Sequence, residues 1–192
     1  MATNPESMKM TVEEYLAFDR ASEIKHEYDD GEAVAMSRGS VEHSALAVRM
    51  TCLLAQQLGD EGPCPVYNSD VRTLVAKRQY VYADVVVSCD VADHRPGNDI
   101  IRAPHLIVEV LSPSTELKDR GKKLNWYQAQ PSVQEYVLIN YRMRLVEVYR
   151  RGEGDAWSYI TCGPGQTITL ESLDIDIDVD TLYGRLAIPA PE

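Results

Sequence analysis

One short segment, residues 106–111 (LIVEVL), restricts the fold more than any other part of the chain. A run that is apolar except for one residue predicts a central strand covered on both faces by other elements. Side chains alternate along a strand, so Ile107, Glu109 and Leu111 are expected to share one face. An ionised carboxylate is almost never fully buried unless it is paired or holds a cation. Glu109 therefore predicts a buried polar site inside a layered α/β fold.

Asp84 raises the same problem in a second apolar segment, residues 82–87 (YADVVV). Two apolar strands that each carry one acid are explained more economically by one shared site than by two separate exceptions. The alternative is that each acid lies at a strand end, solvated or paired with an arginine, as structural ion pairs often are. Lys123, on the helix expected after the Glu109 strand, favours the shared site.

These residue types suit metal-assisted chemistry on a phosphate ester. Magnesium takes oxygen ligands, usually one or two carboxylates together with water and substrate phosphate. The bound ion can activate a water and stabilise charge on a phosphodiester, and a nearby ammonium group can stabilise the same charge. We therefore expect Asp84 and Glu109 to bind Mg²⁺ or Mn²⁺ and Lys123 to be the catalytic cation, with Lys122 as the alternative.

Periodicity and turn residues predict an alternating order of helices and strands. A short helix is expected to start at Thr11, which forms a capping box with Glu14. Further helices are expected over 40–59, 116–129 and 178–183. Strands are expected in a hairpin over 25–36 that turns at Asp30-Gly31, at 66–74, 81–88, 106–111, 134–140 and 144–149, and in a second hairpin formed by 157–161 and 167–170. The acid/apolar alternation of 174–180 predicts an edge strand with a solvated acidic face rather than a calcium loop. We expect a disordered leader over 1–9 and a single domain over 10–186.

Composition excludes several classes of protein. The four cysteines (52, 64, 89 and 162) show no metal-binding spacing, and we expect them to be reduced thiols of a cytoplasmic protein. The N-terminus has no apolar signal core, and no apolar run approaches the roughly 20 residues needed to cross a membrane. A net charge of −11 argues against a general nucleic-acid coat protein but permits one local basic strip. The main basic cluster contains Arg142, Arg144, Arg150 and Arg151, and it either tracks a DNA backbone or only offsets nearby acids.

Several segments together resemble the Uma-two family of putative restriction endonucleases, a branch of the PD-(D/E)XK nuclease superfamily. They are residues 27–32 (EYDDGE), His43, Asp84, 107–115 (IVEVLSPST), 119–124 (DRGKKL), Tyr127 and 133–139 (VQEYVLI). The resemblance spans roughly residues 11–183. It implies a restriction-endonuclease-like α/β (α+β) fold, with a central mixed β-sheet flanked by helices and with Asp84 and Glu109 as metal ligands.

The sequence departs from the superfamily pattern at two positions. Ala83 replaces the proline before the aspartate, which shapes the strand and takes no part in the chemistry. Leu111 replaces the lysine that usually stands two residues after the glutamate. The resemblance implies that the cation comes instead from the following helix, where Lys123 fills the matching position.

Two further residues match family landmarks. His43, near a helix start, is expected to be either a general base or a partner of a metal ligand, or else a partly exposed helix histidine. Glu27 is expected either to orient a metal-bound water or to be an ordinary polar strand residue. Residues 112–115 could donate hydrogen bonds to phosphate, although their first role is turn and capping chemistry.

The expected function is a magnesium-dependent DNA endonuclease that hydrolyses phosphodiester bonds. Its substrate would be DNA, it would not associate with membranes, and it would act as a homodimer because two strand cuts are easiest with two active sites. The main alternative is a catalytically weak or inactive nuclease-fold module that binds DNA or regulates, which the net charge and Leu111 favour. A hydrolase acting on another phosphoester is a third possibility.

Overall fold

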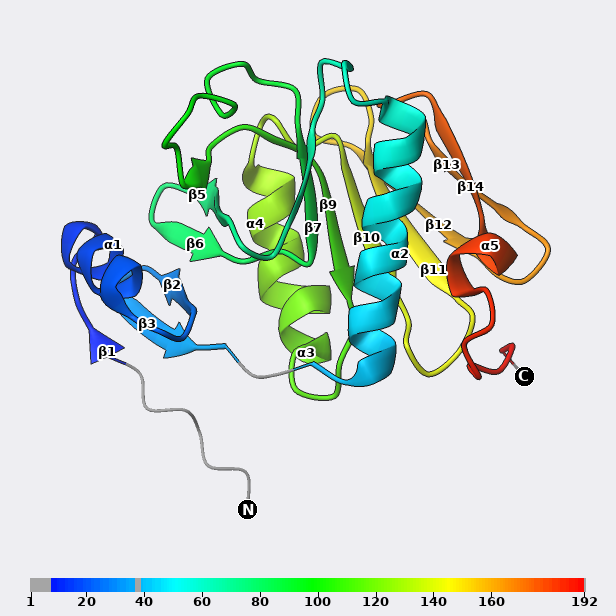
Figure 1. Cartoon of the computed structure of the whole chain (residues 1–192), viewed down its shortest axis with the longest axis horizontal. Coiled ribbons are helices and arrows are strands. Elements are labelled where there is room, and N and C mark those ends of the chain that lie inside the picture. The colour runs from blue at the N-terminus through cyan, green and yellow to red at the C-terminus, as the bar shows by residue number, and fades with distance from the viewer. Residues whose placement is uncertain (1–7, 37–38, 192) are drawn as a thin grey trace.

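The computed structural model describes residues 8–36 and 39–191 (Figure 1). Within these residues the chain forms two six-stranded sheets and a separate two-stranded one. The expected leader over 1–9 lies largely outside the described residues, but Met8–Lys9 form strand β1, which pairs with β3.

The N-terminal sheet has the strand order β1-β3-β2-β6-β5-β8. Its remaining strands are β2 (His26–Asp29), β3 (Glu32–Ala35), β5 (Arg72–Ala76), β6 (Gln79–Val81) and β8 (Ile100–Ile101). Helix α1 (Val12–Ala21) packs on this sheet through stacked Tyr15 and Tyr28, whose ring centroids are 4.7 Å apart. The capping box at Thr11 is confirmed, since both of its hydrogen bonds form.

The predicted hairpin over 25–36 is also confirmed, because β2 pairs antiparallel with β3. Its turn places Asp30 at φ 42° and Gly31 at φ 110°. Positive φ is the conformation that tight hairpin turns need and that Asp-Gly supplies.

The main sheet has the strand order β12-β11-β10-β9-β7-β4. Its strands are β4 (Val66–Asn68), β7 (Val85–Ser88), β9 (Pro104–Val110), β10 (Glu135–Ile139), β11 (Val146–Arg151) and β12 (Trp157–Cys162). Strands β9 and β10 are parallel, whereas the other neighbours are antiparallel, so the sheet is mixed. Every side chain of β10 is buried, as expected for a strand covered on both faces.

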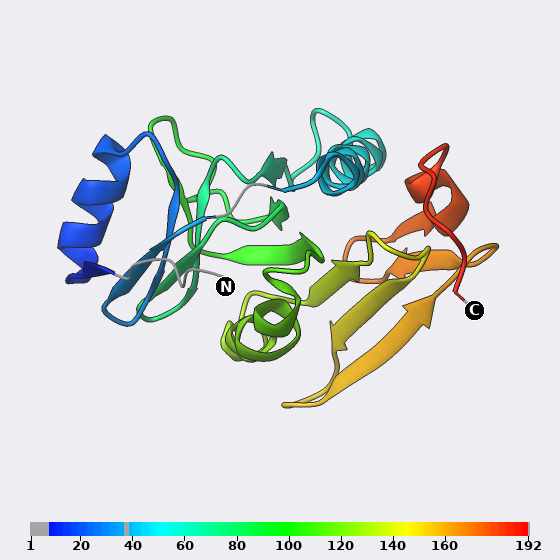
Figure 2. The same ribbon diagram turned by 90° about the horizontal axis from the view of Figure 1, so that it is seen from below.

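Helices cover the two faces of the main sheet (Figure 2). On one face, α2 (Val41–Leu58) packs Leu46, Met50 and Leu54 into a core with alternate residues of β7 and β9. On the other face, Tyr127 of α4 (Leu124–Ala129) packs against Ile107 and its neighbours. Ser40 caps α2 and Gly59 follows its last residue, as predicted. The predicted arrangement of a central mixed sheet flanked by helices is confirmed.

The helix predicted over 116–129 has an interruption. It consists of α3 (Glu116–Lys118), a π-helical turn over Asp119–Lys123, and α4. Single π turns inside α-helices are rare and are frequent at functional sites.

The prediction of two long strands over 66–74 and 81–88 is wrong, because each is divided between the two sheets. Asn68 Oδ1 accepts a hydrogen bond from the backbone N–H of Asp70 (2.9 Å), which forms a turn and separates β4 from β5. The second segment breaks at a bend at Asp84, between β6 and β7. These breaks allow β4 and β7 to pair in the main sheet while β5 and β6 pair in the N-terminal sheet.

The predicted pairing of 157–161 with 167–170 is also wrong. Strand β12 pairs with β11, and β13 (Thr167–Leu170) pairs with β14 (Ile175–Asp178). The strand predicted within 174–180 is confirmed, with Ile175 and Ile177 buried and Asp176 and Asp178 exposed. A short last helix, α5 (Val179–Tyr183), follows it as predicted.

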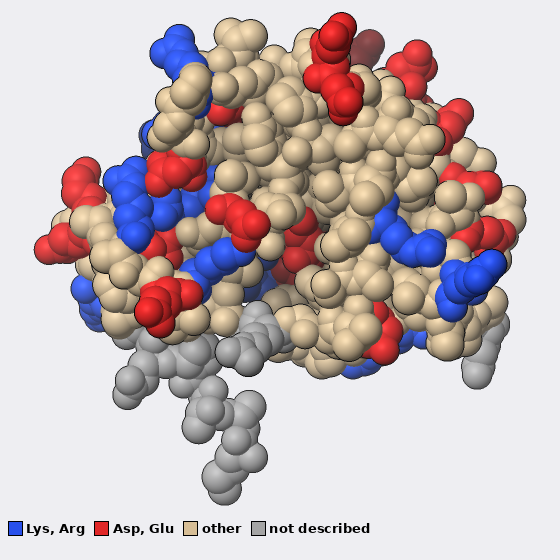
Figure 3. All heavy atoms as spheres, viewed as in Figure 1, with Lys and Arg blue, Asp and Glu red and all other residues tan. Residues whose placement is uncertain are grey.

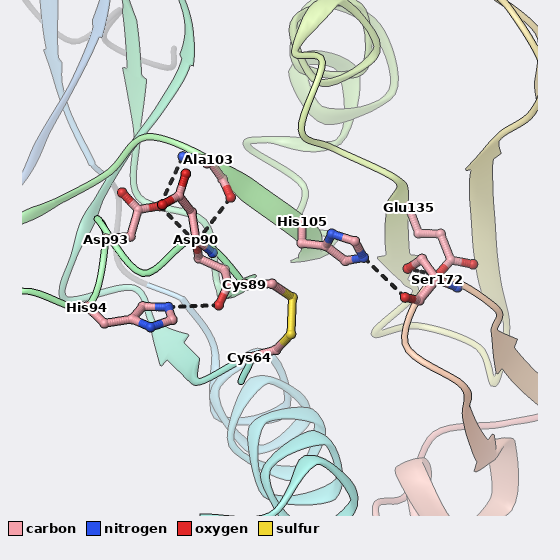
Figure 4. Close-up of a disulfide and its surroundings, with 10 residues drawn as sticks. Cys64, Cys89, Asp90, Asp93, His94, Ala103, His105, Glu135 and Ser172 are labelled. Atoms are coloured by element: carbon pink, nitrogen blue, oxygen red, sulfur yellow. Dashed lines mark hydrogen bonds between the residues drawn. A yellow bond between two sulfur atoms is a disulfide. The ribbon is translucent and has the colours of Figure 1, made fainter. Parts of the chain in front are cut away.

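The expectation of four reduced thiols is wrong for two of them, since Cys64 and Cys89 form a disulfide (Figure 4). Their Cα atoms are 4.2 Å apart. Strands β4 and β7 are antiparallel with Val66 opposite Val87, and continuing this register places Cys64 opposite Cys89. Cys52 and Cys162 are free. We expected a cytoplasmic protein because we expected reduced thiols, and this reason no longer holds for Cys64 and Cys89.

Among the described residues, no helix combines the length and apolar character that crossing a membrane requires.

Candidate active site

Glu109 lies near the end of β9 and is almost completely buried, with 4% of its surface exposed. Its Oε1 accepts hydrogen bonds from Lys123 Nζ (2.9 Å) and from the Tyr127 hydroxyl (2.6 Å). Lys123 is itself 3% exposed. The two donors are four residues apart along the helix, which places them on one face toward the sheet.

The π turn collects further charged groups around Lys123. Two lysines contact Glu27. Lys118 Nζ pairs with Glu27 Oε2, and Lys123 Nζ lies 2.9 Å from Glu27 Oε1. Residues five apart diverge around a regular α-helix, but the i→i+5 hydrogen bonding of a π turn brings them to the same face. Asp119 is also buried, with Oδ1 3.4 Å from Lys123 Nζ. We call these five residues (Glu27, Glu109, Lys118, Asp119 and Lys123) the charge cluster, of which Lys118 is partly exposed.

Asp84 lies beside this cluster, at the bend that begins β7. Val85 pairs with Val108, so continuing the antiparallel register places Asp84 opposite Glu109. Asp84 Oδ2 accepts a hydrogen bond from the backbone N–H of Val110 (2.8 Å), the residue next to Glu109. It also lies 3.1 Å from His43 Nε2 on the first turn of α2.

The electrostatics of Glu109 differ from those of a surface carboxyl group. Burial is the largest cause that raises its pKa, to about 8, and the carboxylates of Asp119, Asp84 and Glu27 raise it further, while Lys123 opposes them. For Glu27, burial opposes ionisation, but the Lys123 and Lys118 ammonium groups outweigh it and lower the pKa. The hydrogen bond that the His43 ring donates to Asp84 raises the pKa of His43.

The acids around this site exceed the cations. Four carboxyl groups (Glu27, Asp84, Glu109 and Asp119) surround two lysines, Lys118 and Lys123. Two buried oxygens, Glu27 Oε1 and Asp119 Oδ1, accept no well-directed hydrogen bond within the described part of the chain, although both lie near Lys123 Nζ. A further cation would offset this excess of buried negative charge.

Asp84 and Glu109 fit a magnesium-type ion as donors. They offer carboxylate oxygens only, and they come from adjacent strands in register. No group of three or more His, Cys, Asp or Glu side chains that could hold a metal ion occurs among residues 8–36 and 39–191. Two carboxylates remain consistent with magnesium, which keeps several waters and takes its other ligands from substrate phosphate.

The structure thus brings five of the predicted site residues together: Glu27, His43, Asp84, Glu109 and Lys123. Lys122, the alternative cation, points elsewhere and pairs with Asp29. Sequence reasoning missed Lys118 and did not predict the contact of Asp119 with Lys123. The 119/123/127 spacing of polar residues toward an apolar sheet was an available signal for Asp119, whereas the position of Lys118 depends on the π turn.

Comparison with known proteins supports the resemblance. Residues 12–180 match the model of the Uma2 family, described as "Putative restriction endonuclease". The chain belongs to this family. All five predicted site residues lie inside the matched range.

Two relatives of the Uma2 chain come from Synechocystis sp. (strain ATCC 27184 / PCC 6803 / Kazusa). "Uncharacterized protein slr1290" is 37% identical over 180 residues, which cover 93% of this chain and 94% of the relative. "Uncharacterized protein sll1609" is 30% identical over 150 residues, covering 77% and 84%.

A solved structure from Anabaena variabilis ATCC 29413, described as a putative nuclease belonging to DUF820, has a similar fold. The TM-score is 0.75 at 18% identity, over 91% of this chain and 97% of the other. The Uma2 chain thus has a nuclease-like fold, with mixed sheets and few helices.

Proposed function

We propose that this chain is a metal-dependent DNA endonuclease that hydrolyses phosphodiester bonds. The proposal depends on one observation: Lys123 Nζ contacts Glu109 Oε1 (2.9 Å), and the pairing of β7 with β9 places Asp84 opposite Glu109. In this reading Asp84 and Glu109 hold Mg²⁺ or Mn²⁺. A bound ion of this kind supplies water activation and neutralisation of phosphate charge.

The protein side chains then have separate roles. Lys123 stabilises negative charge that develops on the phosphodiester. Glu27 and Asp119 fix the ammonium group of Lys123 from two sides, so they are positioning residues. His43 lies against Asp84 and is either a base toward the attacking water or a partner that orients Asp84.

The test is nicking of supercoiled plasmid by the purified chain with Mg²⁺ or Mn²⁺. Glu109→Ala and Asp84→Ala should abolish nicking while circular dichroism shows that both variants remain folded. Nicking that persists unchanged in both variants would reject the proposed site.

A catalytically weak nuclease-fold module that binds DNA or regulates is the second candidate. The observation that favours it is the enclosure of Lys123 among three carboxyl groups, which holds its charge away from a substrate. Intact metal binding by calorimetry without any plasmid nicking would favour this candidate. Hydrolysis of bis(p-nitrophenyl) phosphate without plasmid nicking would indicate a hydrolase of other phosphoesters.

The homodimer belongs to the same proposal, because cutting both strands is easiest with two active sites. Light scattering coupled to size-exclusion chromatography measures it directly, and a monomer that still cuts both strands would contradict it.

A further inference from the structure

A pocket of about 300 Å³ opens beside the candidate site. His43 lines it, and the same side chain contacts Asp84 at 3.1 Å, so the pocket shares a wall with the proposed metal ligands. The wall is tight at this point, because a Cβ added to Gly39 would lie 2.8 Å from His43 Nδ1. The volume is at the lower end for ligand pockets, which suits one small group and excludes a duplex.

The lining combines an apolar part, formed by Leu111 and Pro113, with side chains that can form hydrogen bonds. Besides His43, the pocket is lined by the hydroxyl residues Ser40, Ser112, Ser114 and Tyr141. No acidic residue lines it in the described part of the chain, although the whole chain has a net charge of −11. We call it the serine–tyrosine pocket. Because no acidic side chain lines this pocket, an anionic ligand can enter it beside the proposed metal ligands.

Tyr141 lines the pocket, lies in a turn and packs, partly buried, against the core of the main sheet. Asn140 Oδ1 accepts hydrogen bonds from the backbone N–H of Arg142 (2.8 Å) and of Met143 (3.2 Å). The exposed Arg142 side chain lies over the Tyr141 ring, with Cζ 5.3 Å from the centroid, and its Nε donates to the Tyr141 hydroxyl (2.8 Å). The Tyr141 ring thus lines the pocket, and the Arg142 guanidinium group lies over this ring next to the pocket.

The other arginines of the predicted basic cluster are committed inside the protein. Arg150 pairs with Glu135 and Glu171, and Arg144 with Asp180 and several carbonyl groups. Arg151 donates to three backbone carbonyls. The hypothesis that this cluster tracks a DNA backbone is therefore not supported, except at Arg142. On the face in Figure 3, basic and acidic side chains drawn in colour alternate in small groups without a continuous basic strip.

We propose that the serine–tyrosine pocket receives one unstacked nucleotide of single-stranded or locally unpaired DNA, next to the phosphodiester that is cut. Tyr141 stacks on the base and Arg142 faces a phosphate, while the serine hydroxyls donate hydrogen bonds. Aromatic stacking recognises bases without a large positive surface, and enzymes that must reach a nucleotide often take it out of the helix. This inference rests on the proposed function and adds the class of substrate.

Fluorescence anisotropy measures the inference directly. The probes are a single strand, a perfect duplex, and the same duplex with one unpaired nucleotide, each with Ca²⁺ in place of Mg²⁺. The wild-type chain should bind the first and third probes about tenfold more tightly than the perfect duplex, because stacking of one base contributes a factor of this order. Tyr141→Ala should remove this preference, and Tyr141→Phe should retain it.

Tyr159→Ala is the control, because Tyr159 is an exposed ring on β12 that does not line the pocket. It should leave all three affinities unchanged. Equal affinity of the wild-type chain for paired and unpaired probes would overturn the inference, as would an unchanged preference in a folded Tyr141→Ala variant.

Failure of this inference and failure of the proposed function give different results. A Tyr141-dependent preference for unpaired DNA without any nicking supports the pocket and contradicts the endonuclease. Metal-dependent nicking that disappears in Glu109→Ala but shows no dependence on Tyr141 supports the endonuclease and contradicts the pocket.

Discussion

Lys123 is the residue on which the candidate site depends most. Its ammonium group is almost fully buried and lies within 3.4 Å of Glu27, Glu109 and Asp119. These carboxylates outweigh the cost of its burial and hold its pKa well above the usual value, so it stays charged. A cation enclosed in this way is pre-organised, and its removal leaves several carboxyl groups without compensation.

We predict that Lys123→Met lowers both activity and stability. Loss of an oriented charge in an active site typically reduces kcat about 100-fold, and breaking a buried ion pair costs about 3–5 kcal/mol. Plasmid nicking and urea unfolding measure the two effects. Lys122→Met is the control, because Lys122 is exposed and its pairing with Asp29 should contribute below about 1 kcal/mol. Equal losses in both variants would contradict the role of Lys123.

The raised pKa of Glu109 predicts a pH effect on the metal-free protein. Folding raises this pKa from 4.5 to about 8, so the folded state binds the proton more tightly than the unfolded state. The stabilisation is fully present below pH 4.5 and is lost as the pH rises to about 8. Urea unfolding with EDTA between pH 5 and pH 8.5 should show this decline, and Glu109→Gln should reduce its slope. A wild-type free energy of unfolding that rises through this range would refute the assignment.

At the scale of elements, strand pairing and the π turn decide which side chains meet. The register of β7 and β9 places Asp84 opposite Glu109, and the π turn brings Lys118 and Lys123 to one face of the helix. The register of β4 and β7 places the two cysteines opposite each other. The disulfide thus links the edge strand β4 to β7, the strand that follows Asp84.

We predict that removal of this disulfide destabilises the main sheet. Its cysteines are 25 residues apart, and closing a loop of this length contributes about 3 kcal/mol through the unfolded state. The double variant Cys64→Ser/Cys89→Ser should unfold at lower urea concentration than the wild type, and dithiothreitol should affect only the wild type. Cys52→Ser should behave as the wild type, since Cys52 is a free, exposed thiol. Wild-type unfolding that dithiothreitol leaves unchanged would contradict the prediction.

Local signals in the sequence were sufficient for features that depend on neighbouring residues. The capping box at Thr11, the Asp30-Gly31 turn and the acids within apolar strands could all be predicted. Features that depend on long-range pairing could not. The disulfide, the partner of β12 and the division of strands between two sheets follow from register across the sheet, which single-sequence patterns do not specify. The π turn has no sequence signature that separates residues 119–123 from an α-helix.

At the scale of the whole molecule, charge limits how the chain can meet DNA. The net charge is −11, and most members of the predicted basic cluster are bound internally. Association driven by counterion release needs many free Lys and Arg side chains. Binding by stacking and hydrogen bonding at one pocket needs only a few such side chains.

We predict a shallow salt dependence of DNA binding. Each neutralised phosphate contributes a slope of about −0.9 to log K against log [salt], so one or two contacts give a slope of about −2 or less steep. The Arg142→Gln variant should show a salt slope that is smaller in magnitude by about 1. Anisotropy titrations between 50 and 200 mM KCl measure it. A slope steeper than about −5 would show that an extended basic surface binds the DNA.

The hydrogen bond from the Val110 amide to Asp84 means that this aspartate completes the sheet in addition to any chemistry that it performs. Replacing Asp84 by a residue without an acceptor would leave that strand amide without this hydrogen bond. Glu109 accepts hydrogen bonds instead from two side chains, Lys123 and Tyr127, and Lys123 also contacts Glu27 and Asp119. A substitution of Asp84 should therefore disturb the pairing of β7 with β9 as well as the candidate site, whereas a substitution of Glu109 should act on the charged side chains around it.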